Sequence, residues 1–351
     1  MSSVSWFAKA LAPWYREHHR PLPWRATRDP YRIWLSEVML QQTRVDQGIG
    51  YYHRFLEAFP TVHDLAAASE REVLRLWQGL GYYSRARNLH AAARQVVREH
   101  GGRFPADHAA LRALPGVGDY TAAAVASIAF GLPEPVVDGN VYRVLARVFG
   151  IADSIDGTSG RRTFRELAAR LLDPADPGTH NQAVMELGAT VCTPKNPDCR
   201  HCPLQARCAA LATGTVGQLP VKAGKAKSRG RYFNYLHITD GNRIYMRQRT
   251  GKDIWQGLYE LPLLESPGPL TRRSLKAALD HAFGSGWTIG DEEMEQRHVL
   301  SHQVIHAVFW QVEPPPQAAL PVEWKRVGRR KLGQLAVPRV IERWMEEGRW
   351  G

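Results

Sequence analysis

All four cysteines of this 351-residue chain lie in one 17-residue window, at Cys192, Cys199, Cys202 and Cys208. Disulfides that stabilise small secreted domains join distant segments, whereas cysteines this close together would close only short loops. A turn-rich loop with four thiolates suits one metal centre instead, either tetrahedral zinc or a cubane iron–sulfur cluster. Structural zinc usually uses two tight cysteine pairs and this loop has only one, which favours one [4Fe-4S] cluster over zinc or free thiols.

The length and charge of the chain narrow the class of protein. A chain of 351 residues exceeds one ordinary hydrophobic core, so we expect two domains. The formal net charge of +12 favours nucleic acid as a partner, because phosphate contacts release counterions. No apolar run approaches the roughly 20 residues of a membrane span, and the N-terminal segment is amphipathic and unlike a signal peptide. We therefore expect a cytoplasmic protein with no membrane partner.

Residues 1–212 are predicted to form an all-α region. Apolar residues recur there with helical spacing in the stretches 5–18, 30–58, 69–77, 81–100, 107–113, 119–130, 141–149, 161–172 and 180–190. Residues 213–230 have little apolar periodicity, and their charged residues are all basic, which is typical of an exposed interdomain linker.

Residues 231–351 have a different pattern. Strands are predicted at 232–239, 243–249 and 298–312, and helices at 271–284 and about 338–347. This mixture predicts a small α+β domain.

A glycine-rich turn, Leu114–Gly118, separates two of the helical stretches. Gly116 and Gly118 permit backbone conformations closed to other residues, so the amides around Val117 can face outward and hold a phosphate at the next helix N-terminus. Taken alone, a tight helix–helix connection explains these residues equally well. The pattern resembles the helix–hairpin–helix DNA-binding motif. With the cysteine window downstream, it resembles the iron–sulfur branch of the endonuclease III superfamily.

Longer stretches resemble one branch of that superfamily, the MutY-type adenine DNA glycosylases, over most of residues 5–210. They are Pro23–Arg25, Trp34–Thr43, Gly79–Asn88 and Val137–Val141. The resemblance implies a base-excision-repair enzyme with a six-helix barrel module and an iron–sulfur cluster module. Its partner would be double-stranded DNA with adenine opposite 8-oxoguanine or guanine. We expect a monomer, bacterial-type and cytoplasmic, that is nucleoid-associated when bound to DNA.

Glu37 is the first candidate for catalysis. On a helix it shares a face with Ile33 and Trp34, so its carboxyl is expected to be partly desolvated and its pKa raised. Such a group suits a general acid near neutral pH, although an ordinary exposed glutamate fits the sequence alone. The resemblance implies that Glu37 protonates adenine and later helps to activate water.

Asp138 precedes a predicted helix, and an N-cap role without any part in catalysis would be enough to explain it. The helix terminus would stabilise its ionised form, so we expect Asp138 and Glu37 to have pKa values pushed in opposite directions. The resemblance implies that Asp138 stabilises an oxocarbenium-like sugar, with support from Asn140 and Tyr120.

Tyr120 also bears on the type of reaction. Related endonuclease III enzymes carry at this place a lysine that forms a Schiff base with the sugar. A phenol cannot form an imine, so the resemblance implies a monofunctional glycosylase without lyase activity. A glycosylase/lyase for oxidised pyrimidines and a non-catalytic DNA-binding or redox-sensing iron–sulfur protein are the competing readings.

A base inside a duplex must be extruded before this chemistry can occur. The resemblance implies a wedge that fills the gap and a pocket that receives adenine, although each residue type is also common at surfaces or in cores. The wedge candidates are Leu40, Gln42 and Tyr82, and the pocket candidates are Trp24, Arg25 and Glu186.

The C-terminal part resembles the MutT-like (Nudix-fold) domain that MutY proteins use to recognise 8-oxoguanine. Trp255–Pro262 is similar to the start of a Nudix box, but the acidic metal-binding helix of active hydrolases does not follow. Ser301 and His302 match the Phe-Ser-His loop of the family, with Leu300 in place of Phe. The resemblance implies that Ser301 and His302 contact the oxidised guanine, whereas scattered polar residues on a strand are the simpler explanation.

Overall fold

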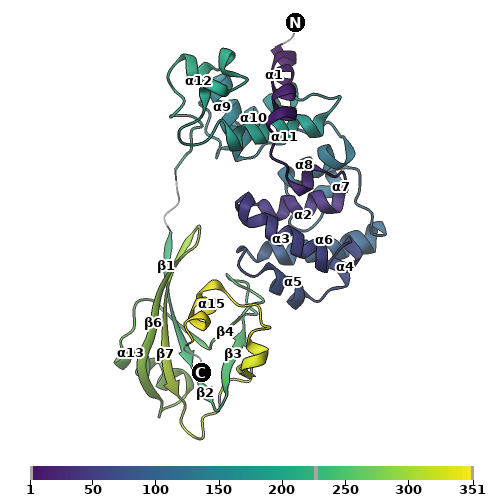
Figure 1. Cartoon of the computed structure of the whole chain (residues 1–351). Helices are drawn as coiled ribbons and strands as arrows, with labels where there is room; N and C mark the ends of the chain where they lie inside the picture. The colour runs from purple at the N-terminus through teal and green to yellow at the C-terminus, as the bar shows by residue number, and fades with distance from the viewer. Residues whose placement is uncertain (1–2, 225–227, 349–351) are drawn as a thin grey trace. The chain divides into compact units, whose positions relative to one another are not determined.

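The computed structural model describes residues 3–224 and 228–348, which divide into two compact units (Figure 1). The first unit contains the residues up to Ala67 and Asn88–Gly224. The second contains Ala68–Arg87 and the described residues from 228 onward. Within the described part of the chain, none of the helices combines the length and hydropathy that a bilayer crossing requires.

The first unit is all-α, as predicted. Its helices are α1 (Ser3–His18), α2 (Pro30–Leu40), α3 (Val45–Ala58), α4 (Val62–Ala67), α7 (His108–Arg112), α8 (Asp119–Phe130), α9 (Gly139–Phe149), α10 (Thr158–Leu171), α11 (Pro177–Thr190) and α12 (Ala209–Ala212). Short 3-10 helices cover Pro23–Arg25, Cys199–His201 and Gln205–Arg207. Helix α6 (Ser84–His100) begins in the second unit and continues into the first.

The stretch 30–58, where apolar residues recur with helical spacing, forms two helices. The structure has α2 and α3 there, separated at Gln41–Arg44, because Gln42 adopts a left-handed conformation with φ of 56° that no α-helix contains. Asp29 caps the start of α2 by accepting a hydrogen bond from the Tyr31 amide at 2.9 Å. Helix α4 was not predicted, because its six residues are too few for a clear periodicity.

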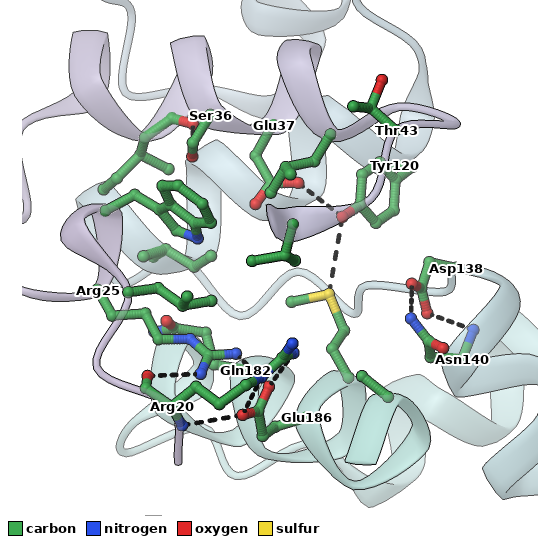
Figure 2. A pocket seen from close by; sticks show the side chains of 18 residues that line it. Arg20, Arg25, Ser36, Glu37, Thr43, Tyr120, Asp138, Asn140, Gln182 and Glu186 are labelled. Carbon is green, nitrogen blue, oxygen red and sulfur yellow. Dashed lines mark hydrogen bonds and ion pairs between the residues drawn. The ribbon is translucent and has the colours of Figure 1, made fainter. Parts of the chain in front are cut away.

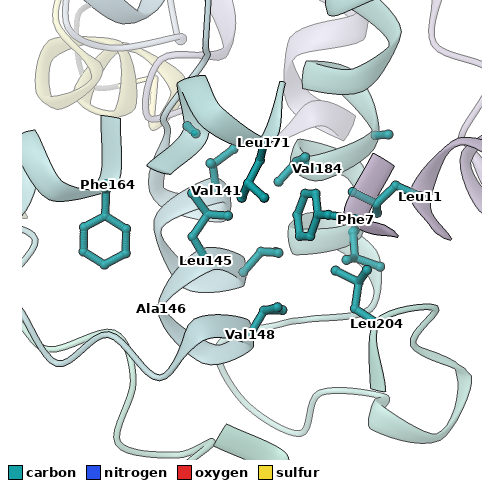
Figure 3. Close-up of a cluster of buried hydrophobic side chains, with 14 of the residues drawn as sticks. Phe7, Leu11, Val141, Leu145, Ala146, Val148, Phe164, Leu171, Val184 and Leu204 are labelled. Atoms are coloured by element: carbon teal, nitrogen blue, oxygen red, sulfur yellow. The ribbon is translucent and has the colours of Figure 1, made fainter. Parts of the chain in front are cut away.

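One hydrophobic core of the first unit contains residues from near its N-terminal end, such as Phe7, and from near its C-terminal end, such as Leu204 (Figure 3). Phe7 of α1, Val141 of α9 and Phe164 of α10 are buried in one apolar cluster. Leu204, from the cysteine-rich loop, is buried in the same cluster, and Cys202 packs against it. The cysteine loop is therefore anchored to the helix that begins beside Asp138.

The second unit contains two small sheets. The first has the strand order β5 (Leu263–Ser266), β1 (Arg229–His237), β7 (Gln303–Glu313) and β6 (Thr288–Val299), in which only β1 and β7 are parallel. In the second sheet, β3 (Arg243–Gln248) pairs with β2 (Thr239–Asp240), β4 (Tyr259–Glu260) and β8 (Lys325–Gly328). The helices of this unit are α5 (Glu70–Trp77), α13 (Arg272–Phe283), α14 (Arg329–Leu332) and α15 (Arg339–Glu346).

The α+β prediction for the C-terminal part is confirmed, but β4, β5, β8 and most of β6 were not predicted, and one predicted strand is wrong. The segment 298–312 is not one strand but the end of β6, a turn at 300–302 and most of β7. This hairpin contains neither glycine nor proline, and only the three consecutive polar residues Ser301–Gln303 interrupt its apolar pattern. Its consequence is that Ser301 and His302 lie at an exposed hairpin tip.

Candidate active site

A cavity of about 180 Å³ opens between α2, α8, the start of α9 and α11. It brings together the four predicted catalytic residues and the three predicted adenine-pocket residues, several of which Figure 2 labels. The predicted residues that line it are Trp24, Arg25, Glu37, Leu40, Tyr120, Asp138, Asn140 and Glu186.

Glu37 lies at one end of this cavity on α2, with only 7% of its surface exposed. The Tyr120 hydroxyl donates a hydrogen bond of 2.6 Å to Glu37 Oε2. Burial raises the pKa of Glu37 to about 7, and the bond from Tyr120 offsets only part of that rise. A carboxyl in this state holds a proton near neutral pH and can transfer it to a group in the cavity.

Asp138 is the N-cap of α9, as the sequence suggested. Its Oδ1 accepts hydrogen bonds from the Asn140 and Val141 amides at 2.9 and 2.7 Å, and its Oδ2 accepts one from Asn140 Nδ2 at 2.8 Å. The expected direction of its pKa is wrong. Burial raises the pKa of Asp138 above its ordinary value even though these bonds oppose the rise.

Glu186, on α11, occupies the opposite end of the cavity and is fully buried. It accepts bonds from the Arg20 amide and Nε at 2.9 and 2.8 Å, and Arg20 Nη2 and Arg25 Nη2 donate to it at 2.8 and 2.6 Å. Burial alone would raise the pKa of Glu186, but the hydrogen bonds from the two arginines outweigh it and lower the pKa to about 2. Glu186 therefore remains charged and fixes both guanidinium groups.

Several lining residues were not predicted. No sequence pattern marks Arg20 as a residue of the site, because its partner Glu186 is 166 positions away. Gln182 and Ala189 could have been found, since they lie four residues before and three residues after Glu186 on the same face of α11. Met185 lies three residues after Gln182 and four before Ala189, so it adjoins both of them.

The wedge candidates lie in different surroundings. Leu40 lines the cavity, whereas Gln42 and Tyr82 are exposed and do not line it. Both have left-handed backbones, with φ of 56° and 47°, which is uncommon for residues other than glycine and is often associated with functional strain.

The pocket candidate Trp24 packs edge-on against Tyr52, with ring centres 5.3 Å apart.

The glycine turn between α7 and α8 agrees with the prediction at one glycine only. Gly116 has φ of 74°, and a Cβ there would lie 2.6 Å from the Asn88 Cβ. Gly118 has φ of −91°, which any residue adopts, so the prediction of a glycine-specific backbone there is wrong. A Cβ on Gly118 would meet no protein atom within 4 Å. The surface beside Gly118 is thus open.

The four cysteines line one cavity together with apolar side chains of α9 and α11, including Val144 and Leu187. Burial raises the pKa of the Cys202 thiol to about 11, so a thiolate there requires a nearby cation. Arg143 links this loop to the active-site cavity. Its Nε donates to the Cys192 carbonyl at 2.6 Å, and its Nη2 donates to Asn140 Oδ1 at 2.8 Å.

At the hairpin tip of the second unit, Ser301 Oγ and His302 Nδ1 lie 3.1 Å apart, and both residues are exposed. The Leu300 amide donates to the Gln303 carbonyl at 2.8 Å and closes the turn. These side chains can therefore contact an external ligand without a change of backbone.

The helical unit, its hairpin and its carboxyl-lined cavity define the class of base-excision DNA repair proteins described as the HhH-GPD superfamily, whose family model matches residues 35–170. A NUDIX domain model matches residues 234–347. The solved structure of a thermostable thymine-DNA glycosylase superposes with a TM-score of 0.54 at 30% identity and covers 59% of this chain and 95% of that one.

More specifically, the chain belongs to the adenine DNA glycosylase family. It is 49% identical to the adenine DNA glycosylase of Rattus norvegicus over 380 residues, covering 92% of this chain and 74% of the rat protein. The Mus musculus adenine DNA glycosylase is also 49% identical, over 234 residues. That alignment covers 64% of this chain, which spans 45% of the length of the mouse protein.

Proposed function

We propose that this protein is a monofunctional DNA glycosylase of base excision repair that releases adenine opposite 8-oxoguanine or guanine in double-stranded DNA. The observation that carries the proposal is the pair Glu37 and Asp138 in one cavity. Glu37 holds a proton up to about pH 7, and Asp138 accepts three hydrogen bonds that favour a negative charge against the rise that burial causes in its pKa. A reaction that needs an acid on the base and an anion beside the sugar matches this pair.

In the proposed reaction, adenine leaves the duplex and enters the cavity. Glu37 gives its proton to a ring nitrogen of adenine, the N-glycosidic bond breaks, and its electron pair leaves with the base. Asp138, held by Asn140, stabilises the positive charge that develops on the sugar. The Glu37 carboxylate then takes a proton from the attacking water, and the product is an abasic site.

Tyr120 supports the monofunctional assignment. Its hydroxyl is directed at Glu37, and burial together with the neighbouring carboxyls raises its pKa well above the ordinary value. The phenol therefore stays protonated and supplies no nucleophilic amine for a Schiff base, which a lyase requires.

Three further sets of residues would contact DNA. The open space beside Gly118 allows a phosphate to approach the amides at the start of α8, which explains a glycine that neither backbone conformation nor packing requires. Exposed Gln42 and Tyr82 would fill the gap left by the extruded base. Ser301 and His302 would contact 8-oxoguanine.

The Nudix-like segment is not expected to hold a catalytic metal. Its Glu260 accepts hydrogen bonds from Arg247 and Arg249, which leaves that carboxylate unsuited to bind a metal ion.

The four cysteines would hold one [4Fe-4S] cluster. Among the described residues, no three His, Cys, Asp or Glu side chains are grouped as a single metal ion requires. Four cysteines that line one cavity, with only one tightly spaced pair in the sequence, suit a multi-iron group better than zinc. The cluster would supply the cationic charge that lets these thiols ionise. Arg143 would then connect the cluster loop to Asn140, so the loop acts as a scaffold for the site. Iron and sulfide analysis tests this cofactor, and stoichiometric zinc would overturn it.

The decisive experiment is adenine release from a duplex with one A:8-oxoguanine pair. We expect free adenine, with strand scission only after alkali. A strand nicked without alkali, or an imine trapped by borohydride, would support a glycosylase/lyase. Specific duplex binding without any base release would support the non-catalytic alternative.

A further inference from the structure

The turn that carries Tyr82 is strained and is held in place from several sides. It joins α5 to α6, and Gly79, Gly81 and Tyr82 have φ of 92°, 76° and 47°. Tyr82 is 43% exposed, so burial of its own ring does not hold it in a left-handed conformation. Such a conformation persists only where the surrounding structure imposes it.

Part of that constraint is local. Trp77 Nε1 donates a hydrogen bond to the Gly81 carbonyl at 3.0 Å, and Arg85 Nη2 donates to the Leu80 and Gly81 carbonyls at 3.2 and 3.1 Å. The Arg85 guanidinium also lies 5.5 Å from the centre of the Tyr82 ring, within the range of a cation–π contact.

The other part comes from the C-terminal segment 333–342, which belongs to the same compact unit. Gln78 Nε2 donates to Glu342 Oε1 at 2.9 Å, and Gln78 Oε1 accepts from the Val337 amide at 3.4 Å. The Tyr83 hydroxyl donates to the Val337 carbonyl at 3.4 Å and also lies 3.3 Å from the Gly79 amide. Residues before and after the turn therefore both form hydrogen bonds with the C-terminal segment 333–342.

Neighbouring contacts make this attachment firm. Arg75 Nη2 donates to the Gly333 carbonyl at 2.7 Å, and Arg87 Nη1 donates to the Gln256 carbonyl at 2.6 Å. A Cβ built on Gly257 would lie 3.0 Å from Leu74 Cδ1, so α5 packs against the loop that contains Gln256 and Gly257.

The same C-terminal segment is connected to the hairpin of Ser301 and His302. That hairpin follows β6, and Gln296 of β6 donates to the Val340 carbonyl of α15 at 3.2 Å. A hydrogen-bonded route therefore runs from the hairpin strand through α15 to Gln78.

We propose that Gln78 and Tyr83 are positioning residues that couple the Tyr82 turn to the hairpin of Ser301 and His302. The inference rests on the proposed function. Recognition of the base opposite adenine and insertion of Tyr82 into the duplex then occur as one event, because both elements are attached to the segment 333–342. Gln78 and Tyr83 act through Tyr82 and do not touch the base.

The test uses the full-length protein and the variants Gln78→Ala and Tyr83→Phe. Single-turnover adenine release is measured on A:8-oxoguanine and A:guanine duplexes. We expect the preference for A:8-oxoguanine to fall about five- to tenfold in each variant, mainly through slower release from that duplex. Gln95→Ala is the matched control, because it removes one glutamine bond to Glu99 on α6 and should leave the preference unchanged.

A double-mutant cycle separates coupling from a loss of stability. If the elements are coupled, Ser301→Ala should lower the preference much less in the Gln78→Ala background than in the wild type. Additive effects, or equal loss on both duplexes with a lower melting temperature, would overturn the inference. If the wild-type protein releases no adenine, the proposed function itself fails. If it prefers A:8-oxoguanine and both variants keep that preference, only the coupling fails.

Discussion

The two ends of the active-site cavity each hold a buried glutamate, and their surroundings give them opposite properties. Glu186 accepts four hydrogen bonds from Arg20 and Arg25, and its pKa is about 2. Glu37 accepts a bond from Tyr120, and its pKa is about 7. Burial raises the pKa at both positions, so the neighbours decide the outcome: two guanidinium groups outweigh desolvation, and one hydroxyl does not. The charged glutamate can anchor structure, and the protonated one can donate a proton.

Glu37→Gln should reduce activity more than any other substitution proposed here. The amide keeps the size and polarity of the side chain but has no acidic proton, so adenine release should fall by about a hundred- to ten-thousandfold. Duplex affinity should change little, because the variant still fits the cavity. Single-turnover release and equilibrium binding to an A:8-oxoguanine duplex measure the two quantities. Release at the wild-type rate would remove Glu37 from the mechanism.

Glu186→Gln should act on stability instead. It leaves the Arg20 and Arg25 guanidinium groups without their buried carboxylate, and breaking such a pair costs about 3–5 kcal/mol. Urea unfolding should show a lower midpoint with an unchanged slope. Glu37→Gln provides the matched control, because it should not lower the midpoint. Equal midpoints for Glu186→Gln and the wild type would contradict the anchoring role.

The pH dependence of stability should separate the two glutamates without any assay of activity. The pKa of Glu186 is depressed to about 2, so its contribution is full above the ordinary pKa of 4.5 and is lost as pH falls toward 2. The pKa of Glu37 is raised to about 7, so its contribution is full below 4.5 and is lost as pH rises through 7. The free energy of unfolding of Glu37→Gln should therefore exceed that of the wild type increasingly between pH 4.5 and 7, and then by a constant amount. A difference that does not change with pH would show that Glu37 has an ordinary pKa.

Local sequence patterns predict some parts of the molecule and leave others unpredicted. Helices of the first unit follow from apolar periodicity, and the burial of Glu37 follows from its neighbours Ile33 and Trp34 on α2. Contacts between distant segments leave no such pattern. The pair of Arg20 and Glu186 is one example, and another is the burial of Asp138, which reverses the direction expected from its place at a helix start.

Backbone conformation is the second property that periodicity does not report. The residues Gln41–Arg44 include neither glycine nor proline, so the left-handed Gln42 between α2 and α3 has no turn signal in the sequence. The same holds for the turn at 300–302, which also contains neither glycine nor proline. In both cases the missed break lies where we propose contact with DNA, consistent with local rules failing at functional sites.

The smallest expected effect comes from Tyr120→Phe, which acts on the environment of Glu37 alone. The Tyr120 hydroxyl stabilises the ionised form of Glu37, so its removal should raise the pKa of Glu37 further. Because release requires protonated Glu37, the rate should fall above about pH 7 in the wild type, and in the variant the fall should begin at higher pH. The rate on the plateau should change by less than about tenfold, the value of one hydrogen bond. Met185→Leu is the matched control, because it removes the thioether 3.7 Å from the same hydroxyl and keeps the bond to Glu37, so the position of the fall should not move. A lower plateau with no shift of the fall would mean that Tyr120 acts on the transition state itself, and the pKa of Glu37 would then be set by burial alone.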